Sequence, residues 1–206
     1  MIKFEKIIFL DMDGVLVNIL KGIENHFVDF SSSTHHYPPT IDLHNTKNPN
    51  EIYKDFNFSN QNTFWLNFNN IRFWENLELY PWAERLIKLC LSSSYKTYVL
   101  TSPSKTATYS ATGKLNFLKK HFHDLVSENR IIISNDKGIL AGPNRVLIDD
   151  TIEKCLDFAN NGGTSILFPQ PYNRNLLEIS PDKVVCPENI DKLFVLLNNL
   201  FGESDD

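Results

Sequence analysis

The sequence feature that most constrains the fold is the stretch of residues 7–15, IIFLDMDGV. Four apolar residues run directly into Asp11, a second carboxylate follows at Asp13, and Gly14 allows the chain to turn sharply. A short, unbroken apolar run is typical of a strand that is buried on both faces of a parallel sheet. Because side chains alternate along a strand, both carboxylates should project to one side at its carboxyl end, where open α/β sheets bind ligands. The two charges would repel unless a metal ion or a shared proton relieves them, although a bare Asp-x-Asp is more often a simple acidic turn.

Polar residues that can bind a phosphate or a metal ion also follow three later strand-like segments. Each signal is weak by itself, because hydroxyl turns, loop lysines and acidic turns are common on protein surfaces. The carboxyl ends of parallel strands meet at one edge of a sheet, however, so these residues are expected to converge with Asp11 and Asp13. The segments are 96–100, which runs into Thr101 and Ser102; 130–134, followed by Asp136 and Lys137; and 145–148, followed by Asp149 and Asp150.

The segments between these strands have the apolar spacing of amphipathic helices, and two further strands follow near the end of the chain. This order of elements predicts an α/β fold with a doubly wound parallel sheet. Asn18, a good N-cap residue, and Pro81 indicate the starts of two helices. The expected helices cover residues 18–30, 81–91, 112–122, 152–159 and 188–200, and the two further strands cover residues 164–168 and 184–186.

Residues 31–70 differ in character from the rest of the chain. Serines, prolines and asparagines interrupt regular structure there, but they are interspersed with aromatic residues, which a disordered linker would lack. We therefore expect a small helical cap at residues 18–75, inserted after the first strand of a core made of residues 1–17 and 76–206. The His35-His36 pair has no cysteine or acidic partner at ligand spacing, so we expect a loop there and not a metal site.

Composition limits the classes of function. The net charge of −5 argues against a surface for a nucleic-acid polymer, because such surfaces are usually basic. The three cysteines are widely spaced and form no CxxC pair, which is typical of reduced thiols and not of a disulfide framework or a zinc site. No apolar run is long enough for a signal peptide or a membrane span. We therefore expect a cytoplasmic protein that binds neither a membrane nor a nucleic-acid polymer.

The motifs at the strand ends resemble, as a set and in their order, those of the haloacid dehalogenase (HAD) superfamily over nearly the whole chain. They are DMDGVLV at 11–17, LTSPSK at 100–105, the Asp136-Lys137 pair and LIDD at 147–150. Within the superfamily they most resemble the 5′(3′)-deoxyribonucleotidases, which remove phosphate from nucleoside monophosphates and carry a short aromatic cap after the first motif. The resemblance implies a HAD-like, Rossmannoid fold and a hydrolase of nucleotide metabolism that acts on a small phosphomonoester.

The resemblance also implies roles for individual residues. Asp11 would be the nucleophile that attacks the phosphate, forming an aspartyl-phosphate. Asp13 would act as the general acid and then as the general base. The residues expected to bind the phosphate or another part of the substrate are Thr101, Ser102, Lys105 and Lys137.

Phosphate transfer to a carboxylate independently requires a cation, because a phosphomonoester dianion repels the attacking group. Carboxylates, a backbone carbonyl and water form an all-oxygen site that suits Mg²⁺. We expect Asp11, Asp13 and Asp150 to hold the ion, together with the adjacent Asp149. Asp150 is preferred to Asp149 because the Asp stands second in the Gly-Asp variants of this motif in the superfamily.

Two positions depart from the family pattern and concern the substrate. Ile19 replaces an aromatic residue that stacks on the base, and Thr151 replaces an arginine that follows the paired aspartates. Most aromatic residues of the cap should pack together in its own small core. Trp65 and Trp74 are the first choices to face the cleft and stack on a planar base.

Three alternatives to a nucleotidase stay open at this point. A HAD phosphatase for a sugar phosphate or another small phosphometabolite would carry the same motifs. A receiver domain also places aspartates, a hydroxyl and a lysine around Mg²⁺, but its adjacent acidic pair follows the first strand and it has no cap. A catalytically idle HAD-like binding protein is disfavoured because every motif residue is present. The preferred base and sugar, the position of the phosphate and the oligomeric state, a homodimer included, are not determined by the sequence.

Overall fold

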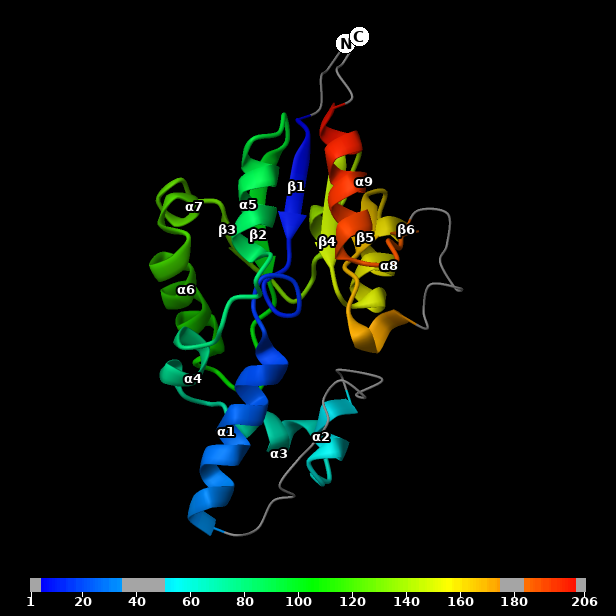
Figure 1. The fold of residues 1–206 in the computed structure, drawn as a ribbon. Helices are drawn as coiled ribbons and strands as arrows, with labels where there is room; N and C mark the ends of the chain where they lie inside the picture. Colours follow the sequence, from blue (N-terminus) through cyan, green and yellow to red (C-terminus); the bar gives the residue numbers. More distant parts are fainter. Residues whose placement is uncertain (1–4, 35–50, 175–183, 203–206) are drawn as a thin grey trace.

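The chain folds into a six-stranded, all-parallel sheet flanked by helices (Figure 1). The computed structural model describes residues 5–34, 51–174 and 184–202. The strands are β1 (Ile7–Leu10), β2 (Lys96–Thr101), β3 (Ile131–Ile133), β4 (Arg145–Asp149), β5 (Thr164–Leu167) and β6 (Val184–Val185). Their order in the sheet is β3-β2-β1-β4-β5-β6, so β1 lies between β2 and β4. This confirms the doubly wound parallel sheet that the sequence predicts.

Helices form where the apolar spacing predicts them, with boundaries that differ by a few residues. Those of the core are α5 (Ala83–Leu91), α6 (Ser110–His121), α7 (His123–Ser127), the 3-10 helix η3 (Gly138–Leu140), α8 (Ile152–Asn160) and α9 (Ile190–Gly202). The apolar spacing does not predict α7 and η3, because segments of five and three residues are too short to show a helical period. Among the described helices, none is long and apolar enough to cross a membrane.

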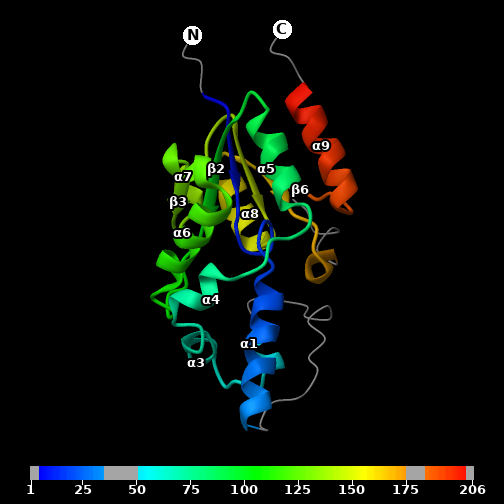
Figure 2. The same cartoon turned by 60° about the vertical axis from the view of Figure 1, so that its left-hand side comes forward.

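The apolar run of β1 is buried on both faces of the sheet, as its lack of alternation predicts. Ile8 and Leu10 belong to the larger core, which also contains the buried side chains of α5 and α9. These two helices lie on the same side of the sheet (Figures 1 and 2). Ile7 and Phe9 belong to a second cluster, in which the ring of Phe158 on α8 lies 5.9 Å from that of Phe9. Helices therefore cover both faces, which leaves the edge at the strand ends for a site.

Between β1 and β2 the chain forms the helical cap, made of α1 (Ile19–Thr34), α2 (Ile52–Asp55), α3 (Gln61–Leu66) and α4 (Ile71–Glu75). Asn18 caps α1 as predicted, because its Oδ1 accepts a hydrogen bond from the backbone N–H of Lys21 at 3.0 Å. The limits of the cap at residues 18 and 75 stay a prediction, and its residues 35–50, with His35-His36, lie outside the described residues.

Aromatic rings make up much of the cap's interior, as predicted. Ring centroids lie 4.5 Å apart between Phe27 and Phe56 and 4.5 Å apart between Phe68 and Phe73. Phe64 contacts several of these rings and is fully buried. The density of aromatic residues in this part of the sequence is therefore largely explained by a small core that belongs to the cap itself.

Candidate active site

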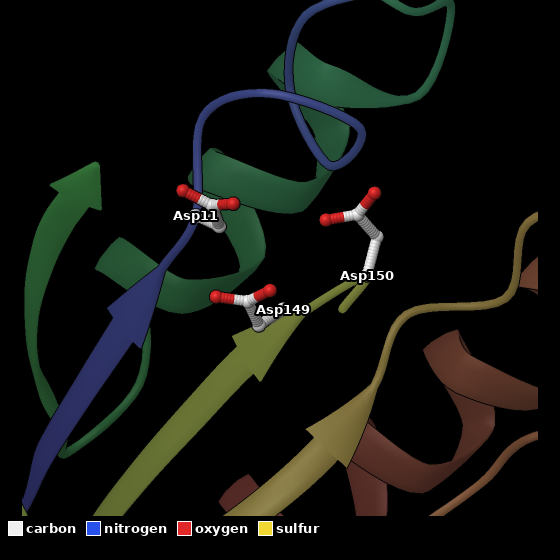
Figure 3. A group of neighbouring side chains, drawn as sticks. All are labelled: Asp11, Asp149 and Asp150. Atoms are coloured by element: carbon white, nitrogen blue, oxygen red, sulfur yellow. The ribbon is translucent and has the colours of Figure 1, made fainter. Parts of the chain in front are cut away.

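The candidate site lies at the carboxyl ends of β1 and β4. Leu10 of β1 pairs in register with Ile148 of β4. From β1 the chain continues to β2 on one side of the pair, whereas from β4 it continues to β5 on the other side. Such a topological switch point opens a crevice at the strand ends. Asp11 immediately follows β1, and Asp149 is the last residue of β4, so both carboxylates lie at these strand ends (Figure 3).

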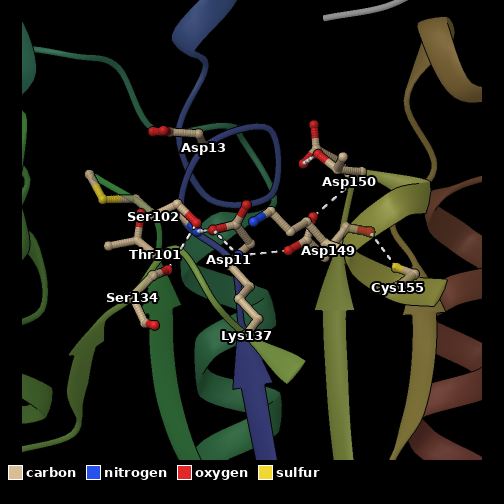
Figure 4. Close-up of polar contacts among 12 residues, drawn as sticks. Asp11, Asp13, Thr101, Ser102, Ser134, Lys137, Asp149, Asp150 and Cys155 are labelled. Atoms are coloured by element: carbon tan, nitrogen blue, oxygen red, sulfur yellow. Dashed lines mark hydrogen bonds and ion pairs between the residues drawn. The ribbon is translucent and has the colours of Figure 1, made fainter. Parts of the chain in front are cut away.

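Asp11, Asp149 and Asp150 form a buried acidic cluster, in which one carboxylate oxygen from each residue lies within 4.8 Å of the others. Lys137, also buried, places its Nζ 2.8 Å from Asp11 Oδ1 and 2.6 Å from Asp149 Oδ2 (Figure 4). The expected convergence of residues from three strand ends is therefore found around one ammonium group.

The electrostatics of the acidic cluster are dominated by burial. Burial raises the pKa of Asp11 to about 7, a rise that Lys137 limits and Asp149 increases. Burial, followed by the charge on Asp149, also raises the pKa of Asp150 well above its ordinary value. Burial alone would lower the pKa of Lys137, but Asp11 and Asp149 raise it above its ordinary value. One ammonium thus faces three carboxylates, which leaves two negative charges uncompensated when all are ionised.

The acidic cluster consequently has the donor set and the charge of a divalent-cation site. Carboxylate oxygens are the ligands that Mg²⁺ prefers, and two positive charges would offset those left by the cluster. Both oxygens of Asp149 already accept hydrogen bonds, Oδ2 from Lys137 and Oδ1 from the backbone N–H of Thr151 at 2.9 Å. Oδ1 of Asp150 has a weaker contact, with the Thr151 hydroxyl at 3.4 Å. Oδ2 of Asp150 accepts a hydrogen bond from the Tyr172 hydroxyl, so Oδ1 is the oxygen of this pair of residues that is least occupied and best able to bind a cation. This agrees with the preference for Asp150 stated from the sequence.

Asp13 lies apart from the acidic cluster, and Figure 4 shows its side chain away from those of Asp149 and Asp150. Its Oδ2 accepts a hydrogen bond from Lys114 Nζ at 2.5 Å. Its Oδ1 is buried and has no hydrogen-bond partner among the residues that the structure describes. Metal binding by Asp13 thus stays a prediction.

Lys114, on α6, is a site residue that the sequence analysis did not identify. Its buried ammonium also donates to the backbone oxygen of Ser102 at 2.6 Å and contacts Thr101 Oγ1 at 3.1 Å. The ring of Trp74 lies 5.2 Å from Nζ. Lys114 occurs in an otherwise ordinary amphipathic helix, and Asp13 is 101 residues away in the chain, so no local signal marks it.

The phosphate-binding residues predicted after β2 lie in three different environments. Thr101 is fully buried against Lys114. Ser102 donates its hydroxyl to the backbone oxygen of Ser134 at 3.0 Å. Lys105 is exposed. Ser102 and Lys105 line the same cavity as the acidic cluster, whereas the roles of all three residues in phosphate binding stay predictions.

The acidic cluster opens into a cavity of about 390 Å³, with walls from both the sheet edge and the cap. Trp65 and Trp74 line it, and their rings stack at 6.2 Å with an angle of 22° between their planes. Trp74 is buried, and its Nε1 donates to the backbone oxygen of Phe68 at 2.8 Å. Trp65 is only half-buried, so it presents more of its ring to a molecule in the cavity.

Solved structures of HAD hydrolases share this fold. YfnB from Bacillus subtilis, described as a HAD-hydrolase bound to magnesium, is similar with a TM-score of 0.60 and 11% identity, over 95% of this chain and 100% of that one. A HAD family hydrolase from Deinococcus radiodurans R1, with bound phosphate and sodium, is similar with a TM-score of 0.58 and 15% identity, over 97% and 99%. A haloacid dehalogenase-like hydrolase from Xanthomonas campestris has a TM-score of 0.58 and 10% identity, over 97% and 93%.

The sequence itself identifies the family more narrowly. No curated protein matches it significantly. The family model described as 5′ nucleotidase, deoxy (pyrimidine), cytosolic type C protein matches residues 5–184, which contain the acidic cluster, Lys137, Lys114 and the expected cap at residues 18–75. The match covers well over half of the chain, and the fold agrees with that of HAD hydrolases. The chain therefore belongs to this 5′ nucleotidase family and is a HAD-family phosphatase of the nucleotidase type.

Proposed function

We propose that the protein is a Mg²⁺-dependent phosphomonoesterase that releases phosphate from nucleoside monophosphates, deoxyribonucleoside monophosphates in particular, through an aspartyl-phosphate on Asp11. The observation that carries the proposal is the placement of the acidic cluster and Lys137 in one cavity with an aromatic wall from the cap. The family model points in the same direction, because its description names a 5′ nucleotidase for deoxy pyrimidine compounds.

Asp11 and Asp150, with Asp149 beside them, would hold the Mg²⁺ ion. When bound, the ion offsets charge on the phosphate and lets a carboxylate approach it. The chemistry of the donor set and the two uncompensated charges support this choice of cofactor. A related HAD hydrolase, YfnB, was also found with bound magnesium.

In the first chemical step, a carboxylate oxygen of Asp11 attacks the phosphorus atom and the ester P–O bond breaks. Lys137, at 2.8 Å from Asp11, supplies positive charge where the phosphoryl group is transferred. Asp13, which lines the same cavity, donates a proton to the leaving oxygen of the nucleoside. Lys114 donates a hydrogen bond to Oδ2 of Asp13 and so holds this side chain in place.

In the second step, water replaces the nucleoside at the active site. Asp13, now deprotonated, accepts a proton from this water, which attacks the phosphorus of the aspartyl-phosphate. The P–O bond to Asp11 breaks, phosphate is released and the carboxylate of Asp11 is restored. Asp11 and Asp13 thus act in both steps. Asp11, the nucleophile, belongs to the acidic cluster, whereas Asp13, the proton donor, contacts Lys114.

The aromatic wall supports a nucleoside substrate. Trp65 lies in the cavity wall with part of its ring exposed, and a planar base can stack on such a ring. Trp74 is held by a hydrogen bond and is packed against Trp65 and Lys114, so we assign it to supporting Trp65. A sugar phosphate has no planar aromatic ring that could stack on Trp65 in this way.

A phosphate-release screen across nucleoside monophosphates and sugar phosphates, with Mg²⁺, tests the proposal. We expect the highest kcat/KM for a nucleoside monophosphate and none for Asp11→Asn, which serves as the control for contaminating phosphatases. Faster hydrolysis of a sugar phosphate than of any nucleotide would overturn the substrate class. Activity without any divalent cation would overturn the metal-dependent mechanism.

A further inference from the structure

The segment that follows β5, residues 168–174, is bound to both sides of the switch point. The side-chain amide of Asn173 donates to the backbone oxygen of Asp150 at 2.9 Å and to that of Phe168 at 2.8 Å. The amide of Gln170 donates to the backbone oxygen of Gly14 at 2.5 Å. Gln170 and Asn173 are both buried, so these bonds are shielded from water. The segment therefore connects the turn after β1 with Asp150, immediately after β4.

Tyr172, in the middle of this segment, contacts the acidic cluster directly. Its buried hydroxyl donates a hydrogen bond to Asp150 Oδ2. The bond leaves Asp150 Oδ1, the oxygen with the weak contact to Thr151, as the one available for a cation. A hydroxyl that binds one oxygen of a carboxylate selects its rotation about the Cβ–Cγ bond, and thereby the direction of the other oxygen.

The space around this hydrogen bond allows little freedom. Gly14 adopts a positive φ of 75°, and a Cβ atom placed on it would lie 2.1 Å from Asp150 Oδ2 and 2.8 Å from the Tyr172 hydroxyl. The carboxylate and the phenol are therefore packed directly against the glycine backbone. Loss of the hydroxyl would leave Asp150 Oδ2 without a hydrogen-bond donor within the described residues, so the carboxylate would no longer be held in this rotation by a polar contact.

Tyr172 does not take part in lining the substrate cavity. It lines a different cavity of about 770 Å³, together with Tyr80 and Trp82. A group outside the substrate cavity cannot contact the reacting atoms, so its effect must pass through Asp150.

We propose that Tyr172 is a positioning residue, which orients the carboxylate of Asp150 for binding of the catalytic cation. The inference rests on the proposed metal-dependent function and adds to it a residue outside the motifs at the strand ends. Removing a hydrogen-bond partner behind a metal ligand typically weakens metal binding by about 10–100-fold. We expect an effect of this size from the loss of a single hydroxyl.

The test compares Tyr172→Phe with the wild type and with Tyr95→Phe. Tyr95 is a half-buried tyrosine just before the start of β2, at the opposite end of the sheet, and its ring packs on Phe201. Calorimetric titration with Mg²⁺ should give a dissociation constant roughly 10–100-fold higher for Tyr172→Phe than for the wild type. Tyr95→Phe should bind Mg²⁺ like the wild type. The KM for a nucleoside monophosphate at saturating Mg²⁺ should stay nearly unchanged in Tyr172→Phe, because the residue does not contact substrate.

A second measurement keeps the test valid if Tyr172→Phe is less stable. The midpoint of thermal unfolding as a function of Mg²⁺ concentration also yields the dissociation constant, because a ligand that binds only the folded chain stabilises it by mass action. In an Asp150→Asn background, Tyr172→Phe should have no further effect on Mg²⁺ binding, since both changes act through one carboxylate.

The outcomes separate this inference from the proposed function. Equal Mg²⁺ affinity in the wild type and Tyr172→Phe, or additive effects with Asp150→Asn, would overturn the role of Tyr172 alone. A wild type that binds no Mg²⁺ and still hydrolyses its substrate would overturn the proposed mechanism as well.

Discussion

Lys114→Met is the substitution that most directly tests the site as the structure shows it. Methionine keeps the length of the side chain on α6 but removes the ammonium that contacts Asp13, Thr101 and the backbone of Ser102. The carboxylate of Asp13 then has no cationic partner within the described residues. We expect a loss both of stability and of turnover, for the same physical reason.

The size of the effect on stability follows from burial. Removing one partner of a buried ion pair typically costs about 3–5 kcal/mol, because the other charge is left unpaired. The side chain of Lys114 is 2% exposed but that of Asp13 is 28% exposed, so water recovers part of the loss. We therefore expect the free energy of unfolding to fall by about 3 kcal/mol, the lower end of that range. For a chain of this length this corresponds to a drop in Tm of roughly 6–12 °C.

Turnover should fall because Asp13 loses the contact that directs it. General acid–base catalysis contributes about 10²–10⁴-fold to a rate, and a misplaced but intact carboxylate should forfeit part of this, roughly 10–100-fold in kcat. The assays are urea unfolding and steady-state phosphate release. Lys119→Met, an exposed change on the same helix, is the matched control and should alter stability by less than about 0.5 kcal/mol.

The double variant Lys114→Met with Asp13→Asn decides whether the ion pair is responsible. Asparagine at position 13 removes the negative charge that Lys114→Met leaves unpaired, so the double variant should be more stable than Lys114→Met alone. A cost below about 0.5 kcal/mol for Lys114→Met, within the range of ordinary surface changes, or no recovery in the double variant would refute the reasoning.

The acidic cluster and the cap provide the remaining tests. Asp11→Asn should abolish turnover but leave the fold intact, and Asp13→Asn should nearly do so; substantial residual activity in Asp11→Asn would contradict the covalent mechanism. EDTA should abolish activity, and Mg²⁺ should restore the activity better than Ca²⁺. Asp150→Ala should raise the Mg²⁺ concentration needed for activity more than Asp149→Ala does; the reverse order would make Asp149 the metal ligand. Trp65→Leu should raise the KM for a nucleoside monophosphate roughly ten- to a hundredfold, because a stacking energy of about 1–3 kcal/mol is lost. The KM for para-nitrophenyl phosphate should hardly change. Equal effects on the two substrates would mean that the base does not bind at Trp65. In metal-free protein, burial raises the pKa of Asp11 to about 7, so the folded chain retains a proton that the unfolded chain releases near pH 4. Stability should therefore decrease as pH rises from about 4 to 7, and less so for Asp11→Asn; parallel stability curves for the two proteins would contradict this.

The sheet and the acidic cluster could be predicted from the sequence because each depends on a local pattern. The unbroken apolar run before Asp11 indicates burial on both faces, and parallel strands necessarily bring their carboxyl ends together. Asp149 and Lys137 therefore reach Asp11 by the geometry of the sheet alone, without knowledge of any individual contact. Asn18 was equally predictable, since a helix cap needs only its own first turn.

Only the tertiary structure decided which further side chains reach the site. Lys114 and Tyr172 have no local signature, because their partners are distant in the chain, 101 residues away for Asp13 and 22 for Asp150. The packing of α6 and of the segment after β5 places them, and that packing depends on side-chain shape across the whole core. The alternation of a strand would place the carboxylate of Asp13 beside that of Asp11. The tertiary structure separates Asp13 from the acidic cluster, because the chain turns at Gly14 and Lys114 holds the Asp13 side chain elsewhere.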